Sequence, residues 1–327
     1  MAEGERMTLK DAYIQGSEEL KRAGLPEAGL DAWYLLEYAT GISRAAYYAD
    51  PGKELASPEQ EQYKICLENR KKRIPLQHIT GVQEFMGLSF SVNEHVLIPR
   101  QDTEILVEKA LELMGKGGGP CEEGKMRILD LCTGSGCVLL SVLHYAASTL
   151  SVSGRAGTAE SAHGNARTET AGGTADASPA GDIIIEGTGT DISGDALVTA
   201  RKNADELGIK AEFIQGDLFE NISGRFAMIL SNPPYIKTKE IDSLQEEVRL
   251  HDPRIALDGK EDGLYFYRRI IKESRNYLLP QSYLVLEIGY DQAEDVGNLM
   301  SAAGYAGITV KKDLAGLDRV VCGRYIR

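Results

Sequence analysis

The stretch Asp130-Leu131-Cys132-Thr133-Gly134-Ser135-Gly136 lies at the end of a short predicted strand over residues 127–131. Its small residues allow a sharp turn and a close approach of the backbone to a ligand. A helix is predicted to begin at residue 136, and its N-terminus adds favourable partial positive charge beside the turn. This order of strand, turn and helix favours a nucleotide-type site, although an ordinary turn between a strand and a helix can have the same composition.

The pattern of short apolar runs followed by amphipathic helices repeats downstream of this turn. We predict helices over residues 136–147 and 194–207. We predict strands over residues 127–131, 183–190, 211–215, 226–230, 283–288, 307–311 and 319–325. Strands that alternate with helices are typical of a parallel sheet covered on both faces. The sequence therefore predicts an α/β fold built on a seven-stranded, mostly parallel, doubly wound sheet.

Residues 148–182 interrupt this pattern and are almost entirely small or polar. Because they bury too little apolar surface to offset the entropy of ordering, we interpret them as a flexible low-complexity insertion. An acidic residue that accepts from ribose hydroxyls is expected about 20 positions after such a turn. Asp191 follows Gly134 by 57 positions, or by 22 when the 35 residues of the insertion are left out. Asp191, with Ile192 beside it, is therefore predicted at the ribose.

A third strand ends in Gln215-Gly216-Asp217-Leu218-Phe219. The Asp217 carboxylate can accept from an exocyclic adenine amine, and Leu218 and Phe219 can flank the adenine ring. A simple turn cap is the alternative interpretation of Asp217. The sequence has no Walker lysine motif, which disfavours an ATPase of that kind.

The tetrapeptide Asn232-Pro233-Pro234-Tyr235 comes just after the apolar strand 226–230. The two prolines restrict the backbone, Tyr235 supplies a flat face for stacking, and the Asn232 amide can both donate and accept. Asn and Tyr at the two ends of the motif, at a strand terminus, favour a reaction site over a plain proline-rich turn.

The remaining sequence predicts three parts. Apolar residues at helical spacing predict a helical N-terminal domain over residues 1–75, and the apolar stripe that contains Trp33 and Tyr34 is interpreted as core. Alternation around Gly87 predicts a β-hairpin linker over residues 76–102, and residues 103–327 form the catalytic domain. The basic run Arg70-Lys71-Lys72-Arg73 is interpreted as a solvated helix end.

Composition restricts the class of protein. The 327 residues include 49 acidic and 36 basic side chains, so the net charge of −13 disfavours a protein whose main task is to bind bare nucleic acid. No apolar run is long enough to span a membrane, and the N-terminus lacks a secretion signal. Five scattered cysteines predict free thiols in the cytoplasm rather than a metal site.

These residues resemble the class I S-adenosylmethionine-dependent methyltransferases and, among them, the release-factor glutamine methyltransferase family (PrmC/HemK). The resemblance covers nearly the whole chain. Besides the turn and Asn232–Tyr235, it rests on Pro75–Gly81, Leu97-Ile98-Pro99-Arg100, Asp102-Thr103-Glu104, Leu286-Glu287-Ile288-Gly289 and Asp313–Arg319. One departure is Cys132, where family members usually have glycine.

The resemblance implies a Rossmann-like fold, S-adenosylmethionine as cofactor, and the glutamine of a Gly-Gly-Gln loop in class I peptide chain release factors as substrate. The implied cofactor-binding residues are Asp130, Cys132, Thr133, Gly134, Ser135, Gly136, Asp191, Ile192, Asp217, Leu218 and Asn232. The implied catalytic residues are Asn232, Pro233, Pro234 and Tyr235, which also bind the substrate together with Phe85 and Arg100. The resemblance further implies that the helical N-terminal domain recognises the substrate and, with the hairpin, holds the rest of the release factor. No metal and no general base are expected, because the sulfonium methyl is already electrophilic and the amide proton leaves after transfer.

Other functions remain open at this point. A methyltransferase for a ribosomal-protein glutamine would carry much the same motifs. A DNA adenine-N6 methyltransferase shares the Asn-Pro-Pro-Tyr motif but needs a basic target-recognition region. A cofactor-binding adaptor or an NAD-dependent oxidoreductase would not explain that motif.

Overall fold

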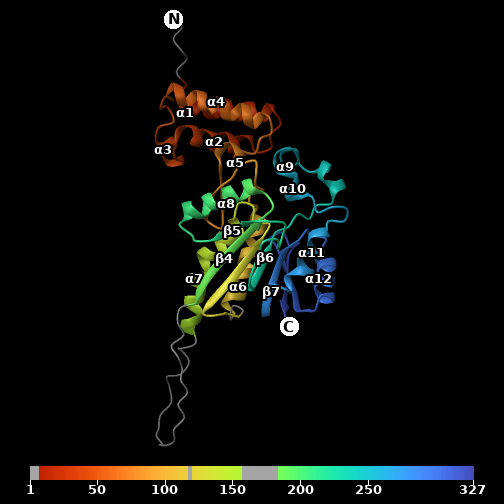
Figure 1. The fold of residues 1–327 in the computed structure, drawn as a ribbon. Helices are drawn as coiled ribbons and strands as arrows, with labels where there is room; N and C mark the ends of the chain where they lie inside the picture. The colour runs from red at the N-terminus through yellow and green to blue at the C-terminus, as the bar shows by residue number, and fades with distance from the viewer. Residues whose placement is uncertain (1–6, 117–119, 157–182) are drawn as a thin grey trace, which may run out of the picture. The chain divides into compact units, whose positions relative to one another are not determined.

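The computed structural model describes residues 7–116, 120–156 and 183–327 (Figure 1). Within these residues the chain divides into two compact units. The first contains the described residues up to Gln83, with Val92–Glu94 and Ser243–Asp252. The second contains Glu84–Ser91 and the described residues of His95–Asp242 and Pro253–Arg327.

The first unit is helical. Its helices are α1 (Leu9–Arg22), α2 (Ala28–Thr40), α3 (Arg44–Ala49), α4 (Ser57–Lys71), α5 (Leu76–Thr80) and α9 (Glu246–His251). Helix α1 begins at a capping box in which Thr8 Oγ1 accepts from the Asp11 backbone N–H, and the Asp11 side chain accepts from Thr8. Leu20, Leu35 and Leu36 lie in its core and have no exposed surface. Trp33 is also buried, as predicted, whereas Tyr34 is 42% exposed, so the prediction that it belongs to the core is wrong.

Arg70 corrects the interpretation of the basic run as a solvated helix end. Its side chain is buried, and its Nε and Nη2 donate to Asp31 and Glu247, each at 2.8 Å. Burial raises the pKa of Asp31, and the charge of Arg70 opposes this shift. The sequence provides no local signal for this pairing, because Glu247 follows Arg70 by 177 positions.

The second unit is built on a seven-stranded sheet with strand order β5-β4-β3-β6-β7-β9-β8. Its strands are β3 (Lys125–Leu131), β4 (Ile184–Asp191), β5 (Glu212–Gln215), β6 (Phe226–Ser231), β7 (Leu278–Glu287), β8 (Tyr305–Lys312) and β9 (Asp318–Tyr325). All neighbouring pairs are parallel except those of β9, which runs antiparallel to β7 and β8. The predicted mostly parallel, doubly wound sheet is confirmed.

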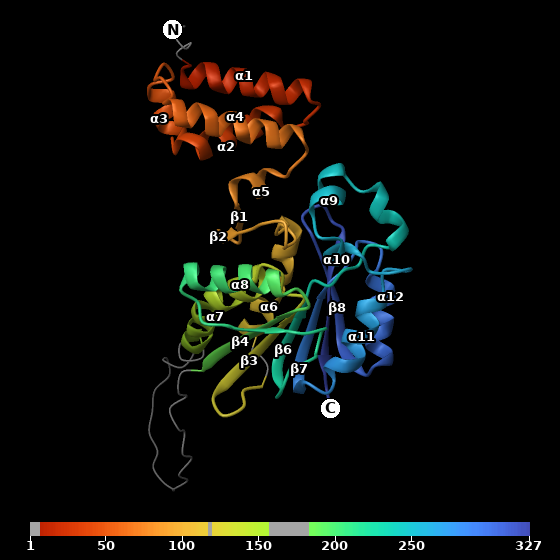
Figure 2. The ribbon, with the colours of Figure 1, turned by 45° about the horizontal axis from the view of Figure 1, so that its top comes forward.

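Helices cover both faces of this sheet (Figures 1 and 2). On one face lie α6 (Glu104–Gly115), α7 (Cys137–Ala156) and α8 (Gly194–Leu207), and on the other lie α11 (Tyr265–Ser274) and α12 (Ala293–Ala302). Short helical segments are η1 (Gln101–Thr103), η2 (Thr238–Ser243) and α10 (Arg254–Leu257), and the predicted hairpin is β1 (Val82–Phe85) with β2 (Leu88–Ser91).

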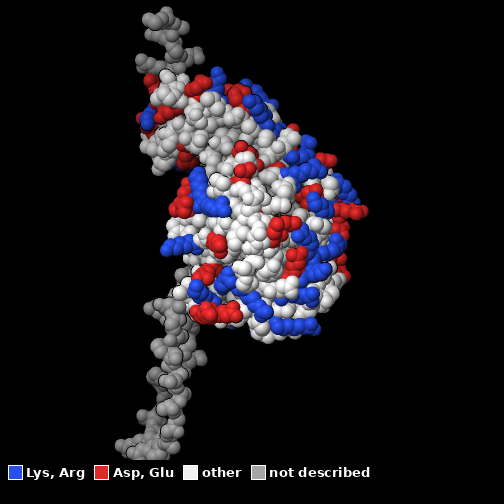
Figure 3. Space-filling view, in the orientation of Figure 1, with Lys and Arg blue, Asp and Glu red and all other residues white. Residues whose placement is uncertain are grey.

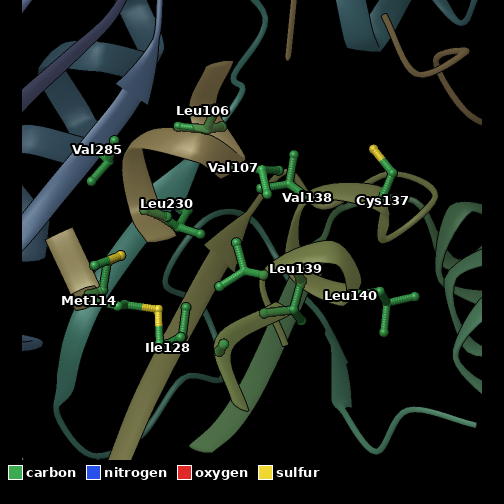
Figure 4. Packing of buried hydrophobic residues seen from close by; sticks show 14 of the residues in the cluster. Leu106, Val107, Met114, Ile128, Cys137, Val138, Leu139, Leu140, Leu230 and Val285 are labelled. Atoms are coloured by element: carbon green, nitrogen blue, oxygen red, sulfur yellow. The ribbon is translucent and has the colours of Figure 1, made fainter. Parts of the chain in front are cut away.

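Alternate residues of β3 point into the two cores. Ile128 packs with Leu106 of α6 and Leu139 of α7 (Figure 4), whereas Leu129 and Leu131 belong to the core on the opposite face. Because α7 is held against the sheet by these contacts, the turn that joins β3 to α7 is anchored at both ends.

The connection after α7 differs from the prediction. The helix continues to Ala156, beyond the predicted end at residue 147 and into the segment interpreted as a flexible insertion. The rest of that predicted insertion, residues 157–182, lies outside the described residues.

The surface carries both charges. Lys and Arg are interspersed with Asp and Glu on the face drawn in Figure 3. Among the described residues, no helix is both long and apolar enough to cross a membrane. All five cysteines are free thiols, as predicted.

Candidate active site

A cavity of about 300 Å³ lies in the second unit where β3, β4 and β6 end. Strand order reverses beside β3, and ligands of open α/β sheets bind outside the carboxyl ends of strands at such a point. Of the residues predicted to bind cofactor or substrate, those that line the cavity are Arg100, Asp130, Cys132, Thr133, Gly134, Ser135, Asp191, Ile192, Asp217, Leu218, Asn232 and Pro234.

The turn after β3 forms one wall of the cavity. Thr133 Oγ1 donates to Asp130 Oδ2 at 2.6 Å, and the Thr133 backbone N–H donates to Thr190. Gly136 does not line the cavity. A Cβ at Gly136 would lie 3.2 Å from Leu140, and its φ of 80° favours glycine. Gly136 therefore shapes the turn rather than the cavity surface.

Asp191 is held by backbone amides at the end of β4. Its Oδ2 accepts from the Gly134 N–H at 3.0 Å and its Oδ1 from the Ser193 N–H at 2.9 Å. Burial raises the pKa of Asp191, and these amide hydrogen bonds oppose the shift. Burial also raises the pKa of nearby Asp130, to about 7. The two donors fix the direction of the Asp191 carboxylate at the cavity wall.

Asp217 lies at the cavity edge with a partner that the sequence did not suggest. Both of its carboxylate oxygens accept from Arg269 Nη1, at 3.0 and 2.9 Å. Arg269 belongs to α11, which also contributes Tyr265 and Phe266 to the lining. The sequence does not reveal that this helix contributes to the cavity. Its apolar stripe, with Tyr267 and Ile270 buried, is that of an ordinary core helix.

The Asn232–Tyr235 segment leaves the end of β6. Asn232 Nδ2 donates to Thr103 Oγ1 at 3.3 Å, and the Tyr235 carbonyl accepts from Gln292 Nε2 at 3.2 Å. Gln292 Nε2 also donates to Gly263, and its Oε1 accepts from the Gly289 N–H at 2.9 Å. The buried side chain of Gln292 thus links the Asn232–Tyr235 segment to the loops that contain Gly263 and Gly289.

Pro233 and Tyr235 are not part of the cavity lining, whereas Asn232 and Pro234 are. The Tyr235 ring packs against the core on the α11 face of the sheet, and burial raises the pKa of its hydroxyl. The structure therefore presents Asn232 to the cavity and uses Tyr235 to anchor the segment.

Phe85 lies elsewhere. It is 1% exposed and belongs to the core beneath α6, in edge-to-face contact with Phe90. The structure thus gives Phe85 a packing position rather than the predicted place at the substrate.

The lining residues that sequence analysis missed include, besides those of α11, four from the segment after residue 252: Pro253, Ile255, Ala256 and Lys260. No motif marks them.

The described residues contain no group of three or more His, Cys, Asp or Glu side chains placed to hold a metal ion. Three acidic side chains, Asp130, Asp191 and Asp217, line the cavity. Together with the amide-rich turn, they suit a ligand with ribose hydroxyls and amino groups.

The fold and this cavity define a class I S-adenosylmethionine-dependent methyltransferase. A model of the PrmC N-terminal domain matches residues 11–81, and a model of the methyltransferase small domain matches residues 174–251. Among solved structures, the hMettl16 catalytic domain in complex with MAT2A 3′UTR hairpin 6 has the same fold (TM-score 0.51, 12% identity, 84% of this chain and 86% of that chain).

Whole-chain relatives define the family more closely. The release factor glutamine methyltransferase of Caulobacter vibrioides is 36% identical over 97% of this chain and 96% of the relative. That of Agrobacterium fabrum is 33% identical over 99% of this chain and 100% of the relative. The chain belongs to the release factor glutamine methyltransferase family.

Proposed function

We propose that this protein methylates the side-chain nitrogen of the glutamine in the Gly-Gly-Gln motif of class I peptide chain release factors, with S-adenosylmethionine as methyl donor. The observation that carries the proposal is the shared cavity. Asn232 lines the same cavity of about 300 Å³ as Asp191 and the Gly134 turn. Whole-chain kinship with release factor glutamine methyltransferases supports the choice of substrate.

The residues of the cavity fit the cofactor. Asp191, oriented by two backbone amides, would accept hydrogen bonds from the ribose hydroxyls. Leu218 would contact the adenine, and Asp217 would accept from its exocyclic amine beside Arg269. The turn from Cys132 to Ser135 would hold the amino-acid end of the cofactor, with Asp130 close to its ammonium group.

The bound cofactor supplies an electrophilic methyl group on a sulfonium. A glutamine amide nitrogen is a weak nucleophile, because its lone pair is delocalised into the carbonyl. The chain's task is therefore to position and polarise that amide. Asn232 Oδ1 and the Pro233 carbonyl would accept the two amide hydrogens, which raises electron density on nitrogen and aims it at the methyl group. No general base is needed, because the proton leaves after transfer.

The test is mass spectrometry of a purified class I release factor after incubation with the protein and S-adenosylmethionine. We expect one added methyl group on the Gly-Gly-Gln glutamine, and none on a release factor in which that glutamine is replaced by alanine. Methylation of ribosomal protein or of DNA in parallel reactions, with none on the release factor, would overturn the substrate assignment.

The proposal includes the setting of the reaction. We propose that the protein acts in the cytoplasm, where the five free thiols stay reduced. Release factors are its proposed protein partners, and direct nucleic-acid binding forms no part of the function. The net charge of −13 supports this choice over a DNA adenine methyltransferase.

A further inference from the structure

Three sequence segments that the proposed reaction does not use converge behind Asn232. They carry Thr103 at the end of η1, Glu287 at the end of β7, and Arg319 near the start of β9. Thr103 is 3% exposed, Glu287 is 2% exposed and Arg319 is 9% exposed. Buried polar side chains are normally hydrogen-bonded, so these three are expected to interact with one another or with Asn232.

The contact between Asn232 and Thr103 decides which end of the amide meets the cavity. Asn232 Nδ2 donates to Thr103 Oγ1 at 3.3 Å. With the NH₂ group directed at Thr103, the Oδ1 atom is the end left to accept an amide hydrogen from the substrate. The reverse orientation would present a donor to a substrate that also offers donors, and no hydrogen bond would form.

Thr103 can accept from Asn232 in this way only if its own hydroxyl proton points elsewhere. Glu287 lies beside both side chains, because hydrogen bonding from the Thr103 hydroxyl and from the Asn232 amide lowers its pKa. An ionised carboxylate only accepts, so it draws the Thr103 proton and the Asn232 NH₂ group toward itself. Its Oε2 atom is buried and makes no hydrogen bond among the described residues.

Arg319 holds the turn that carries Thr103. Its Nη2 lies 3.2 Å from Asp102 and 2.9 Å from Asp313. Asp102 directly precedes Thr103, so the ion pair ties η1 to β9 and restricts the position of the hydroxyl. Arg319 therefore fixes the position of the turn that carries Thr103, and Glu287 orients the proton of the Thr103 hydroxyl.

We propose that Thr103 and Glu287 are positioning residues for methyl transfer, which orient the Asn232 amide so that Oδ1 faces the substrate nitrogen. The inference rests on the proposed function, because it assigns Asn232 Oδ1 the role of acceptor for the glutamine amide. Neither residue contacts the reacting atoms in this scheme. Both act through Asn232.

A pH dependence follows from this arrangement. Burial raises the pKa of Glu287 to about 7, opposed by hydrogen bonding from Thr103 and Asn232 and by the charge of Arg319. The other charged or titratable groups that interact with Glu287 are Asp102, Cys137, Tyr235 and Tyr267. Protonated Glu287 can donate to Thr103, which frees the Thr103 proton to face Asn232 Oδ1 and reverse the amide. Turnover therefore falls as the pH drops through about 7.

The first test compares Thr103→Val, which keeps the shape and removes the hydroxyl, with Thr103→Ser, which keeps the hydroxyl. We expect Thr103→Val to lower kcat on release factor about tenfold, the effect of one lost hydrogen bond. The Kd for S-adenosylmethionine should stay close to wild type, and Thr103→Ser should restore kcat. Unchanged kcat in Thr103→Val, equal loss in both variants, or a change confined to cofactor affinity would overturn the inference.

The second test uses the pH profile of kcat at saturating substrates, in wild type and in Glu287→Gln. We expect the wild-type profile to fall below about pH 7 and this acid limb to weaken in Glu287→Gln, because the amide does not titrate. Asp130, whose pKa is also raised to about 7, titrates in both proteins. An acid limb of the same depth in wild type and in Glu287→Gln would therefore overturn the role of Glu287. Absence of release factor methylation by the wild type is a separate outcome, because it overturns the proposed function before any variant is compared.

Discussion

The two ends of the cavity are built in different ways. At the proposed cofactor end, Asp191 is oriented by the backbone amides of Gly134 and Ser193. At the methyl-transfer end, the side chain of Asn232 is oriented by the side chain of Thr103, which comes from 129 positions earlier in the chain. Backbone amides are fixed by the fold itself, whereas a chain of side-chain contacts depends on each member.

Because of this difference, we expect affinity and turnover to separate in variants. Changes at the Asp191 end should alter the binding of S-adenosylmethionine, because its contacts there are equal before and during the reaction. Changes at the Asn232 end should alter the rate, because the amide contacts strengthen as charge develops on the substrate nitrogen.

The largest effect is expected for Asn232→Ala, which removes the proposed acceptor for the substrate amide. We expect kcat to fall about 10²- to 10³-fold, as for loss of one oriented polar group at a reacting centre. The Kd for S-adenosylmethionine, measured by calorimetry, should change by a few-fold at most. Methyl transfer near the wild-type rate would remove Asn232 from the mechanism and leave the two ends equivalent.

Asp191→Ala should show the opposite pattern. We expect the Kd for S-adenosylmethionine to rise about 10- to 150-fold, because hydrogen bonds to a charged group contribute roughly 1.5–3 kcal/mol. At saturating cofactor, kcat should stay close to wild type. Asp191→Asn is the matched control, because it keeps the shape and one acceptor oxygen and should weaken binding less. A large loss of kcat in both variants, with Kd unchanged, would contradict the separation.

The same difference explains what could be predicted from sequence. The turn, Asp191 and the Asn232–Tyr235 segment each lie at the end of a strand, so local patterns predicted the sheet and brought most of the site together. Thr103 and Glu287 come next to Asn232 only after the chain folds, and Gln292 reaches the Tyr235 carbonyl in the same way. No spacing rule links residues 103, 232 and 287.

Phe85 and Arg70 also show that contacts between residues far apart in the chain cannot be predicted from local sequence. The family resemblance placed Phe85 at the substrate, yet Phe85 completes a core because the hairpin packs beneath α6. A basic run favoured a solvated helix end, yet Arg70 is buried because two acids from distant segments meet it. Residue type constrains what a side chain can do, whereas burial depends on elements far away in sequence.

Gln292→Leu tests the support of the transfer end without changing Asn232. The substitution leaves the buried carbonyls of Tyr235 and Gly263 and the Gly289 N–H without this partner. We expect the free energy of unfolding to fall by about 2 kcal/mol, measured by urea denaturation. The control is Gln215→Leu, because Gln215 is exposed in the same unit and donates one hydrogen bond, to Ile192. It should change stability by about 0.5 kcal/mol or less. Equal effects would show that Gln292 is not a structural clamp.

The smallest effect concerns Cys132, at the proposed cofactor end. Its φ is 59°, a left-handed conformation that costs a residue with a Cβ about 1–2 kcal/mol. Cys132→Ala and Cys132→Gly both remove the thiol, but only glycine removes the Cβ. At most positions glycine is less stable than alanine by about 0.5–1 kcal/mol, because its unfolded chain has more freedom.

Here the order should invert, with Cys132→Gly more stable than Cys132→Ala by about 1 kcal/mol in the same denaturation experiment. The matched pair cancels the loss of sulfur packing, so the sign of the difference reports backbone conformation alone. If Cys132→Ala proved the more stable variant, the turn would not impose a left-handed residue at this position. The cofactor end would then owe its shape to side chains, as the transfer end does, and the contrast between the two ends would fail.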